Sequence, residues 1–385
     1  MALASASATA SSTSIVSSPS PTSNSRPFGA LFCPKPRKLR SYHVSSQFSF
    51  NCIVPPLART HLPTLRFSSI ADSPVTEAEI PGSSIDSWKK FAENVSGEWD
   101  GFGADFTCEG KPVELPESVV PEAYREWEVK VFDWQTQCPT LANPKEQVLQ
   151  YRTIKLLPTV GCEADAATRH SIDERSFGDM SSKAEALAYE SSGCYIAVWS
   201  LQDKEVEKLI ELEYCLINPQ DRESRVRISQ VVSIKKKDAE MSLKSIKVFC
   251  EQWYGPFRNG DQLGGCVIRD SAFASTPSMN TSEVIGTWEG LISVATFHRS
   301  QNSSLQSLEE AGTRRSKREE SMSPVLLPKQ LWCSMQDREN AETISQIGWV
   351  FSHGQCISAS CIFSSDGELK EVAISRETLQ GDKAL

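Results

Sequence analysis

The chain has 385 residues and a formal net charge of −9, but this charge is distributed unevenly. Residues 1–71 contain seven basic residues and no acidic one, so the rest of the chain carries −16. An acidic body argues against non-specific nucleic-acid binding, which needs clustered basic side chains. Two basic runs depart from this pattern, at 235–237 and 314–318, and we interpret both as solvated surface.

The acid-free N-terminal segment resembles a targeting sequence. Residues 1–71 are dominated by Ser, Ala, Thr and Pro and lack the continuous apolar core of about 7 to 15 residues that a secretory signal needs. A Ser/Ala-rich start followed by a basic stretch favours a disordered plastid transit peptide, cleaved near residues 70–73. The alternative is a disordered tail that stays attached. We therefore expect a chloroplast protein, in the stroma or associated with the thylakoid surface.

The remaining residues show no signal for a membrane span or a metal. No apolar run approaches the ~18 to 20 residues of a spanning helix, and the densest one covers only 194–199. Ten cysteines follow residue 71 without a C-x-x-C pair, and most lie in apolar runs, where reduced thiols behave as small hydrophobes. We expect a soluble protein with no metal, no cofactor and no obligatory disulfide.

The first predicted element is a helix over residues 87–95. Trp88, Phe91 and Val95 recur at helical spacing, Asp86 is placed to cap the N-terminus, and Gly97 follows the end. After this helix the pattern changes to short runs of period two separated by turn residues, which is typical of antiparallel strands.

Eight such strands are predicted before residue 273, at 98–107, 126–134, 148–157, 193–201, 207–217, 224–234, 243–254 and 264–272. The polar stretch between the third and fourth is interpreted as a loop at 173–182 and a helical turn at 183–189. Sequential antiparallel strands suit an up-and-down barrel, which leaves no exposed edge. A barrel of eight strands has room for side chains or one small ligand.

A repeat indicates a second module. The pattern G-x-W-[DE]-G at 97–101 recurs at 286–290, each time at the start of a strand, and self-similarity of this kind changes the expected domain count. The second copy is followed by a charged stretch, 300–323, that we expect to be disordered, and by strands near 326–335, 345–351, 356–363 and 368–375. We predict a barrel over 84–275 and a second, incomplete module over 280–385.

The Gly-x-Trp pattern after a short helix resembles that of lipocalins and other calycins. This resemblance implies that Trp99 plugs the closed end of a barrel and that an arginine of the last barrel strand covers its ring. Arg269 is the residue at that position, and Trp288 occupies the place of Trp99 in the second copy. The resemblance gives all three residues a structural role.

The stretch 249–254, together with Arg258, Leu263 and 269–271, resembles the last strands of S/U-type phycobiliprotein lyases, which are lipocalin-like and hold a linear tetrapyrrole. The overall layout is more similar to a plant and cyanobacterial lipocalin-like family of unassigned activity in which two modules follow each other. This resemblance covers most of the chain from Trp88 onward and implies a mainly β protein that binds a hydrophobic or tetrapyrrole-type molecule.

Candidate ligand-binding residues are charged or aromatic side chains on apolar strand faces. Arg152 shares a face with Ile154 and Leu156, and Glu251 alternates with Phe249 and Trp253. Charged residues on such faces rarely bury unpaired. Arg152 with a glutamate such as Glu211 or Glu213 is therefore an interior ion pair, a ligand anchor or a surface pair. Four tryptophans could wall a planar ligand or form plain core: Trp127, Trp134, Trp199 and Trp253.

Catalysis finds little support in the sequence. It contains no nucleophile elbow, no H-E-x-x-H and no phosphate-cradling glycine loop before a helix. Two hypotheses follow: a plastid carrier or chaperone for a hydrophobic or tetrapyrrole-type ligand, or a non-enzymatic assembly factor that binds a chloroplast protein. A third hypothesis, an isomerase or lyase that uses Glu251 or Arg269, is weaker.

Overall fold

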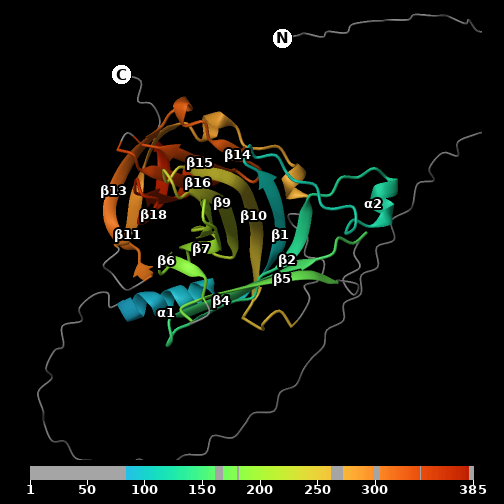
Figure 1. The fold of residues 1–385 in the computed structure, drawn as a ribbon. Coiled ribbons are helices and arrows are strands. Elements are labelled where there is room, and N and C mark those ends of the chain that lie inside the picture. Colours follow the sequence, from blue (N-terminus) through green and yellow to red (C-terminus); the bar gives the residue numbers. More distant parts are fainter. Residues whose placement is uncertain are drawn as a thin grey trace, which may run out of the picture. The chain divides into compact units, whose positions relative to one another are not determined.

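The computed structural model describes residues 84–160, 168–179, 182–261, 272–298, 304–338 and 340–380, all of which belong to one unit. The predicted transit peptide, Arg269 and all but the last residue of the predicted strand 264–272 lie outside these residues. The described chain is mainly antiparallel β structure, which confirms the predicted fold class (Figure 1).

Eleven strands form the first sheet, in the order β12-β6-β7-β8-β9-β10-β1-β2-β4-β3, with β5 paired to β4. Neighbouring strands are antiparallel except β12 and β6, which are parallel. Among the described residues the pairings do not close this sheet into a ring. The strands are β1 (Glu98–Thr107), β2 (Asp133–Gln137), β3 (Thr140–Asn143), β4 (Val148–Leu156), β5 (Arg169–Phe177), β6 (Ala184–Tyr189), β7 (Tyr195–Asp203), β8 (Glu207–Ile217), β9 (Ser224–Lys235), β10 (Met241–Gly255) and β12 (Leu305–Ser307).

Seven strands form the second sheet, in the order β13-β11-β18-β17-β16-β15-β14. All its strands come from the predicted second module, and the first sheet takes only β12 from that module. The strands are β11 (Gly286–Thr296), β13 (Glu309–Arg318), β14 (Val325–Leu327), β15 (Leu331–Asp337), β16 (Thr343–Ser352), β17 (Gln355–Phe363) and β18 (Leu369–Gln380).

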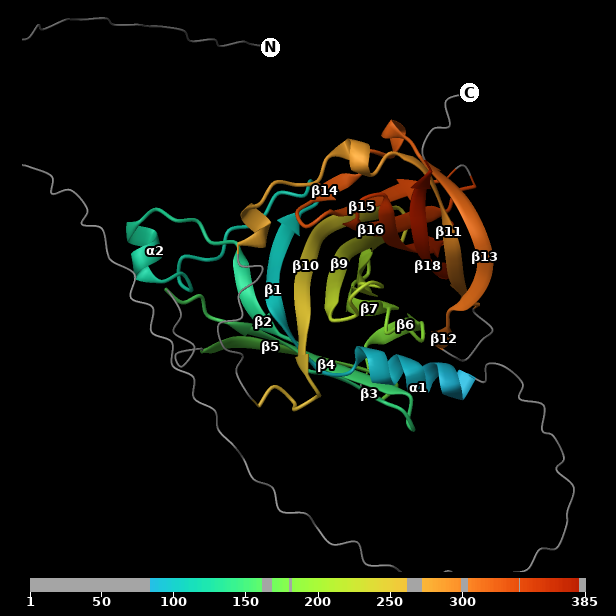
Figure 2. The same cartoon turned by 180° about the vertical axis from the view of Figure 1, so that it is seen from behind.

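Helix α1 (Ser84–Val95) confirms the predicted helix. Trp88, Phe91 and Val95 are fully buried, and the Phe91 ring packs against the Tyr189 and Tyr195 rings at centroid distances of 5.1 and 6.3 Å. Figure 2 shows the helix lying beside β3 and β12, which both contact it. The apolar face that the sequence predicted therefore closes one end of the first sheet.

Several predicted strands of the first sheet are confirmed: β1, β4 and β7 to β10 lie within a few residues of their expected ranges. Other predictions are wrong. The predicted strand 126–134 is mostly replaced by the short helix α2 (Glu122–Glu126) and a turn, with β2 starting at Asp133. The predicted loop at 173–182 and helical turn at 183–189 are largely β5 and β6. The sequence of β5 is polar because this strand is exposed along most of its length, so it lacks the apolar alternation that predicts a strand.

The charged stretch 300–323 was expected to be disordered, and its described part forms β12, β13 and a 3-10 turn instead. Strand β13 is an edge strand exposed along nearly its whole length. Charged side chains on an edge strand discourage pairing with other chains, so an edge strand can lack the apolar alternation of a core strand. The second module consequently has more strands than the sequence indicated.

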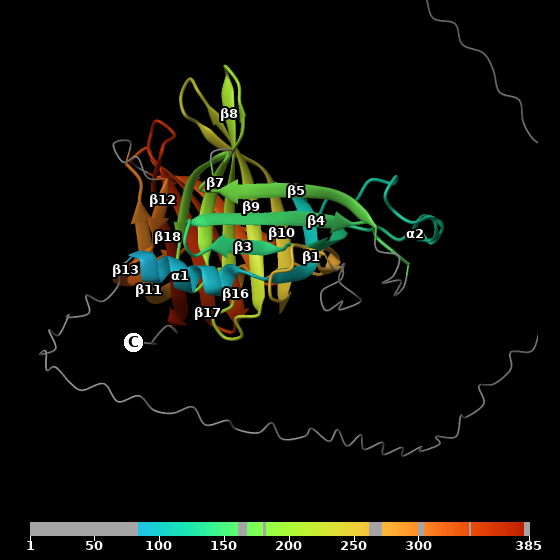
Figure 3. The ribbon, with the colours of Figure 1, turned by 90° about the horizontal axis from the view of Figure 1, so that it is seen from below.

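The two sheets pack face to face across one apolar core. The hydroxyl of Tyr214 on β8 lies 3.1 Å from that of Ser345 on β16, and Ser345 donates to Gln230 on β9. Buried side chains of both sheets belong to the same hydrophobic cluster. On the first sheet, β3, β4 and β5 run across β9 and β10, as seen in Figure 3. This leaves the opposite faces of β8 to β10 pointing toward β4 and β5, where polar residues gather.

Candidate functional site

The face of β8 to β10 that points toward β4 and β5 is called here the inner face of the first sheet. It holds buried charges where the sequence led us to expect mainly apolar side chains. Strand alternation places Glu211 and Glu213 of β8 on this face, with Arg225 and Arg227 of β9 and Glu251 of β10. Each of these five residues is at most 3% exposed, apart from Glu251 at 4%. Burial of ionised groups is costly unless they are paired and hydrogen-bonded. Their contacts therefore define the site.

At one end of the inner face, Arg225 covers Trp99. The guanidinium carbon lies 4.2 Å from the ring centroid, and the indole N–H donates to the Val95 carbonyl oxygen at 3.0 Å, which ties the ring to the end of α1. Arg225 Nε donates to Glu251 at 2.6 Å. The resemblance to calycins implied this arrangement with Arg269, and the arginine over the ring is Arg225 of β9.

Glu251 is shared between two arginines. Besides Arg225, it accepts hydrogen bonds from Arg227 Nε and Nη2 at 3.0 and 2.9 Å. Burial acts to raise the pKa of Glu251, but the charges of Arg225 and Arg227 outweigh it, so the pKa is lowered. The carboxylate is thus held ionised and enclosed, and it lines neither of the two cavities described below. A general acid or base role for Glu251 has no access to a substrate in this geometry.

Glu213 is the centre of the network. Its carboxylate accepts hydrogen bonds from the hydroxyls of Tyr151 and Tyr195, the latter at 2.9 Å, and from the indole N–H of Trp199 at 2.8 Å. Arg227 Nη1 approaches it at 3.3 Å. Burial and the neighbouring Glu213 charge raise the pKa values of both tyrosines well above the usual range, so both hydroxyls stay protonated donors.

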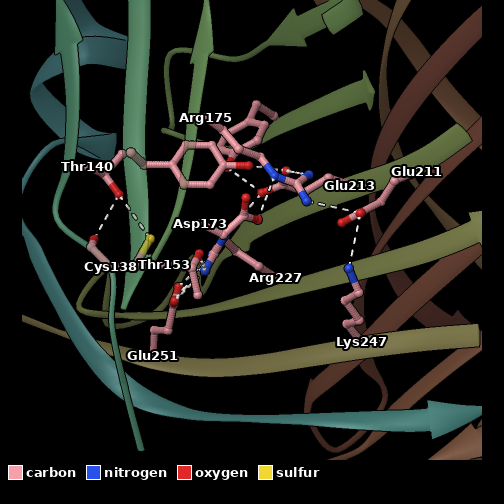
Figure 4. Close-up of polar contacts among 12 residues, drawn as sticks. Cys138, Thr140, Thr153, Asp173, Arg175, Glu211, Glu213, Arg227, Lys247 and Glu251 are labelled. Carbon is pink, nitrogen blue, oxygen red and sulfur yellow. Dashed lines mark hydrogen bonds and ion pairs between the residues drawn. The ribbon is translucent and has the colours of Figure 1, made fainter. Parts of the chain in front are cut away.

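Arg175 of β5 forms the outer part of the network, as Figure 4 shows. It contacts Asp173 at 3.1 Å and Glu211 at 3.0 Å, and it lies 5.3 Å from the Trp199 ring. Lys247 donates to the same Glu211 at 3.2 Å. Burial tends to raise the pKa of Glu211, whereas Arg175 and Lys247 lower it, and the net direction is down.

Two cavities flank Arg175. The larger, with a volume of about 630 Å³, is named here the first-sheet cavity, and the smaller has about 190 Å³. Tyr151, Asp173 and Arg175 line both. Such a volume is within the range of ligand pockets. The first-sheet cavity is lined by Pro139, Gln150, Tyr151, Arg152, Asp173, Glu174, Arg175, Ser176, Asp179, Ser182, Lys183, Trp199, Ser200, Leu201, Phe257 and Asn259.

A loop after β10 forms one wall of this cavity. Buried Glu98 accepts hydrogen bonds from the backbone N–H groups of Arg258 and Gly260, the second at 3.3 Å. From the other side, Arg152 donates to the carbonyl oxygen of Asn259, and Arg169 donates to that of Gly260 at 2.9 Å. Three side chains from β1, β4 and β5 therefore hold the loop that carries Phe257 and Asn259.

The predicted ligand-binding residues separate into two groups. Arg152 and Trp199 both line the first-sheet cavity, and Arg152 lies 3.7 Å from Glu174. Glu251 is enclosed by arginines. Trp253 is 38% exposed, and its indole N–H donates to the Ser96 carbonyl oxygen at 3.4 Å, so it lies away from the cavity. Of the other aromatic candidates, Trp127 is 61% exposed and Trp134 is buried and stacked on His170.

Sequence reasoning missed Arg175, Arg227 and Tyr151. A signal for part of the network was present: Glu-x-Glu at 211–213 and Arg-x-Arg at 225–227 occupy alternate positions of two adjacent strands. Opposite charges at period two on a predicted hairpin indicate a paired, charged face. Arg175 carried no such signal, because its strand looked like a loop.

The second module repeats the contact between a tryptophan and an arginine with different connections. The Trp288 indole donates to the Val284 carbonyl oxygen at 2.9 Å, which matches Trp99 and Val95. Arg318 lies 4.9 Å from the Trp288 ring and donates to Glu377. Glu377 is opposite Gly290 in the register, as Glu251 is opposite Gly101. The arginine comes from β13, on the other side of the tryptophan strand from β18.

The described part of the chain contains no group of three or more His, Cys, Asp or Glu residues placed to hold a metal ion, and its cysteines form no disulfide. None of its helices is long and apolar enough to cross a membrane.

No family model matches the sequence, and no curated protein matches it. A solved structure that is similar is that of a DUF3598-family protein of unknown function from Nostoc punctiforme, with 12% identity, coverage of 76% of this chain and 99% of that chain, and a TM-score of 0.44.

Proposed function

We propose that the protein is a carrier that holds an amphipathic small molecule in the first-sheet cavity. The observation that carries the proposal is a cavity of about 630 Å³ whose lining includes the aromatic side chains of Trp199 and Tyr151 and the cationic side chain of Arg152. Ligand sites combine apolar surface with placed polar groups, and this lining has both, with polar residues in the majority. The class of ligand follows from its lining.

The lining favours an amphipathic ligand over a purely hydrophobic one. Trp199, Tyr151, Leu201 and Phe257 offer apolar and aromatic surface for a flat or extended body. Basic and acidic side chains stand among them, so a ligand without polar groups would place apolar atoms against charges that water now solvates. Tetrapyrroles fit this description, because they join a flat conjugated body to carboxylate side chains.

Two cations of the lining are available to a ligand carboxylate. Lys183 is exposed, and its side chain has no hydrogen-bond or ion-pair partner among the described residues. Arg152 has one weak carboxylate contact, 3.7 Å to Glu174, in addition to its bond to the Asn259 backbone. Arg175, by contrast, is enclosed by three carboxylates. We assign the anchoring of an anionic group to Lys183 and Arg152, and the shaping of the cavity wall to Arg175.

The test is a titration of the purified protein with biliverdin, protoporphyrin IX and a carotenoid, followed by tryptophan fluorescence. We expect saturable quenching by at least one tetrapyrrole, because Trp199 lines the cavity. Lys183→Ala and Arg152→Ala should each weaken binding by about tenfold, the worth of one hydrogen bond to a charged group. Lys204→Ala is the matched control, since Lys204 is an exposed lysine away from the cavity. Absence of quenching by every compound would refute the carrier role.

The cellular setting is part of the same proposal. A Ser/Ala-rich, acid-free segment over 1–71 supports import into a chloroplast. A fluorescent protein fused behind residues 1–80 should accumulate in chloroplasts of a plant cell. Retention of that fusion in the cytosol would contradict the chloroplast location. It would not contradict ligand binding in the first-sheet cavity.

A second candidate is an assembly factor that binds a chloroplast protein, and the segment between β1 and β2 favours it. Val113, Trp127 and Val129 of this segment are 43, 61 and 46% exposed, and α2 stands away from both sheets in Figure 3. Exposed aromatic residues are enriched at protein interfaces. Affinity purification from stroma with wild type and Trp127→Ser distinguishes this candidate: a partner retained by the first and lost by the second supports it.

A further inference from the structure

The concave face of the second sheet contains a cavity of its own, here called the second-sheet cavity. Its volume is about 470 Å³, and it shares no lining residue with the first-sheet cavity. Strand register shows which residues face it. Ser375 of β18 is opposite Ser358 of β17, and Ser360 is opposite Gln346 of β16. Residues opposite each other point to the same side of a sheet, so these four form one polar floor.

Most of this floor is not committed to the protein's own hydrogen bonds. Ser358 donates to Glu377 at 3.0 Å, as does Ser316 at 3.1 Å. The side chains of Ser360, Ser375 and Gln346 have no hydrogen-bond partner within the described part of the chain, although all line the cavity. Hydroxyl and amide groups left free in a concavity are donors for a bound molecule or for water.

One wall of the cavity is cationic. On β13, Ser316 and Arg318 reach Glu377 on the inner face, and strand alternation puts Arg314 on that same face. Across the register Arg314 is opposite Gly290, which has no side chain to compete for the space. Arg314 is exposed, and its side chain has no ion-pair or hydrogen-bond partner among the described residues.

The charges of the wall do not cancel. The two carboxylates that line the cavity are engaged, because Glu319 pairs with Lys317 at 2.7 Å and Glu377 with Arg318. Arg314 and Arg315 form no ion pair within the described residues, although Glu289 is opposite Arg315 in the register, and Arg338 lies 4.0 Å from Glu342. The cavity thus combines surplus positive charge with neutral donors.

We propose that the second-sheet cavity binds a small molecule or headgroup that carries a phosphate or sulfate group, with Arg314 as its principal charged contact. Guanidinium groups form paired hydrogen bonds to such oxyanions, and Ser360, Ser375 and Gln346 supply further donors. This site is separate from the carrier site, and either can exist without the other. The charges of the edge strand β13 also discourage aggregation. That role does not require the unpaired donors of Ser360, Ser375 and Gln346 on the cavity floor.

Isothermal titration calorimetry with inorganic phosphate and glycerol 3-phosphate tests the soluble source, and sedimentation with phosphatidylglycerol or phosphatidylcholine vesicles tests the lipid source. We expect saturable binding that weakens at high salt. Arg314→Ala should weaken it by about tenfold or more, and Ser375→Leu should abolish it by filling the floor. Arg222→Ala, which removes an equally exposed arginine from a turn of the first sheet, should leave it unchanged.

The outcomes separate the two sites. Phosphate binding that persists in Lys183→Ala, together with tetrapyrrole quenching that persists in Arg314→Ala, supports independent sites. Binding to phosphatidylglycerol alone, lost in Arg314→Ala, identifies a lipid headgroup as the source. Equal binding by wild type and Arg314→Ala, or no binding to phosphate, glycerol 3-phosphate or either vesicle, overturns the proposal. Far-UV circular dichroism checks that each variant is folded.

Discussion

Arg225 lies over the indole ring of Trp99 at 4.2 Å and at the same time donates to Glu251 at 2.6 Å. The ring, the cation and the carboxylate come from β1, β9 and β10, so three strands meet in one buried contact. The cation interacts with the ring face and the carboxylate together. This contact closes one end of the first sheet.

The first prediction concerns this ion pair. Glu251→Gln should destabilise the protein by about 3–5 kcal/mol, because buried Arg225 loses its carboxylate partner and buried Arg227 keeps only Glu213. Urea unfolding at neutral pH measures the change in the free energy of unfolding. Glu240→Gln is the control: it breaks the exposed pair with Lys235 and should cost about 0–1 kcal/mol. Equal effects of the two variants would show that Glu251 is not held as an ionised partner.

The second prediction concerns Asp133. Burial raises its pKa to about 6, although backbone N–H groups at Ala274 and Phe273 act to lower it. Because the folded-state pKa lies above that of the unfolded chain, the neutral acid stabilises the fold at low pH, and this contribution is lost as the pH rises through about 6. Asp133→Asn should therefore raise stability at pH 7.5 by up to about 3 kcal/mol and give no gain at pH 3.5.

Urea unfolding of Asp133→Asn at the two pH values checks this, with Asp238→Asn at an exposed turn as the control. A gain for Asp133→Asn that is the same at both pH values would contradict the titration argument.

The third prediction concerns the last glycine of the repeated motif. A Cβ atom at Gly101 would lie 1.9 Å from the Cys250 carbonyl oxygen, and one at Gly290 would lie 1.7 Å from that of Arg376. Backbone atoms cannot move aside as a side chain can, so Gly101→Ala and Gly290→Ala should each cost about 3 kcal/mol or more. Gly312→Ala is the comparison: its φ of +90° is unfavourable for alanine, but nothing lies within 4 Å, and about 1–2 kcal/mol is expected. Thermal unfolding compares the loss of stability in the three variants. Equal losses would contradict the close approach of the strands at Gly101 and Gly290.

The fourth prediction concerns the independence of the two modules. A fragment of residues 76–278 loses β12, the neighbour of β6, and the Ser345 contacts to Tyr214 and Gln230. It also uncovers apolar surface that is buried between the sheets. We expect the fragment alone to bind a hydrophobic dye and to unfold without cooperativity, and co-expression with residues 279–385 to restore a cooperative transition. A fragment that unfolds cooperatively at the midpoint of the whole chain would establish the modules as separate domains.

Strand alternation explains which elements were predictable. The strands β8, β9 and β10 alternate between an apolar face toward the second sheet and a charged face toward β4 and β5, and their limits were predicted closely. β5 and β13 are exposed along most of their length and present no apolar face to a core. The alternation of apolar and polar residues gives no signal for such strands. They are strands because they pair with β4 and β11, and this pairing depends on the sequence of those neighbours.

The candidate site shows the same difference between features set by local sequence and features set by distant strands. The amino-acid sequence by itself determined the mainly β class, the helix of Trp88, the repeated tryptophan motif and the candidacy of Arg152 and Trp199, since each depends on local spacing. Only the tertiary structure decided that Arg225 covers Trp99, that Glu251 is shared by Arg225 and Arg227, and that Trp253 faces away from the cavity. Those outcomes depend on register and sheet curvature between distant strands. The free energy of a buried charge is set by the partners that the fold brings to it.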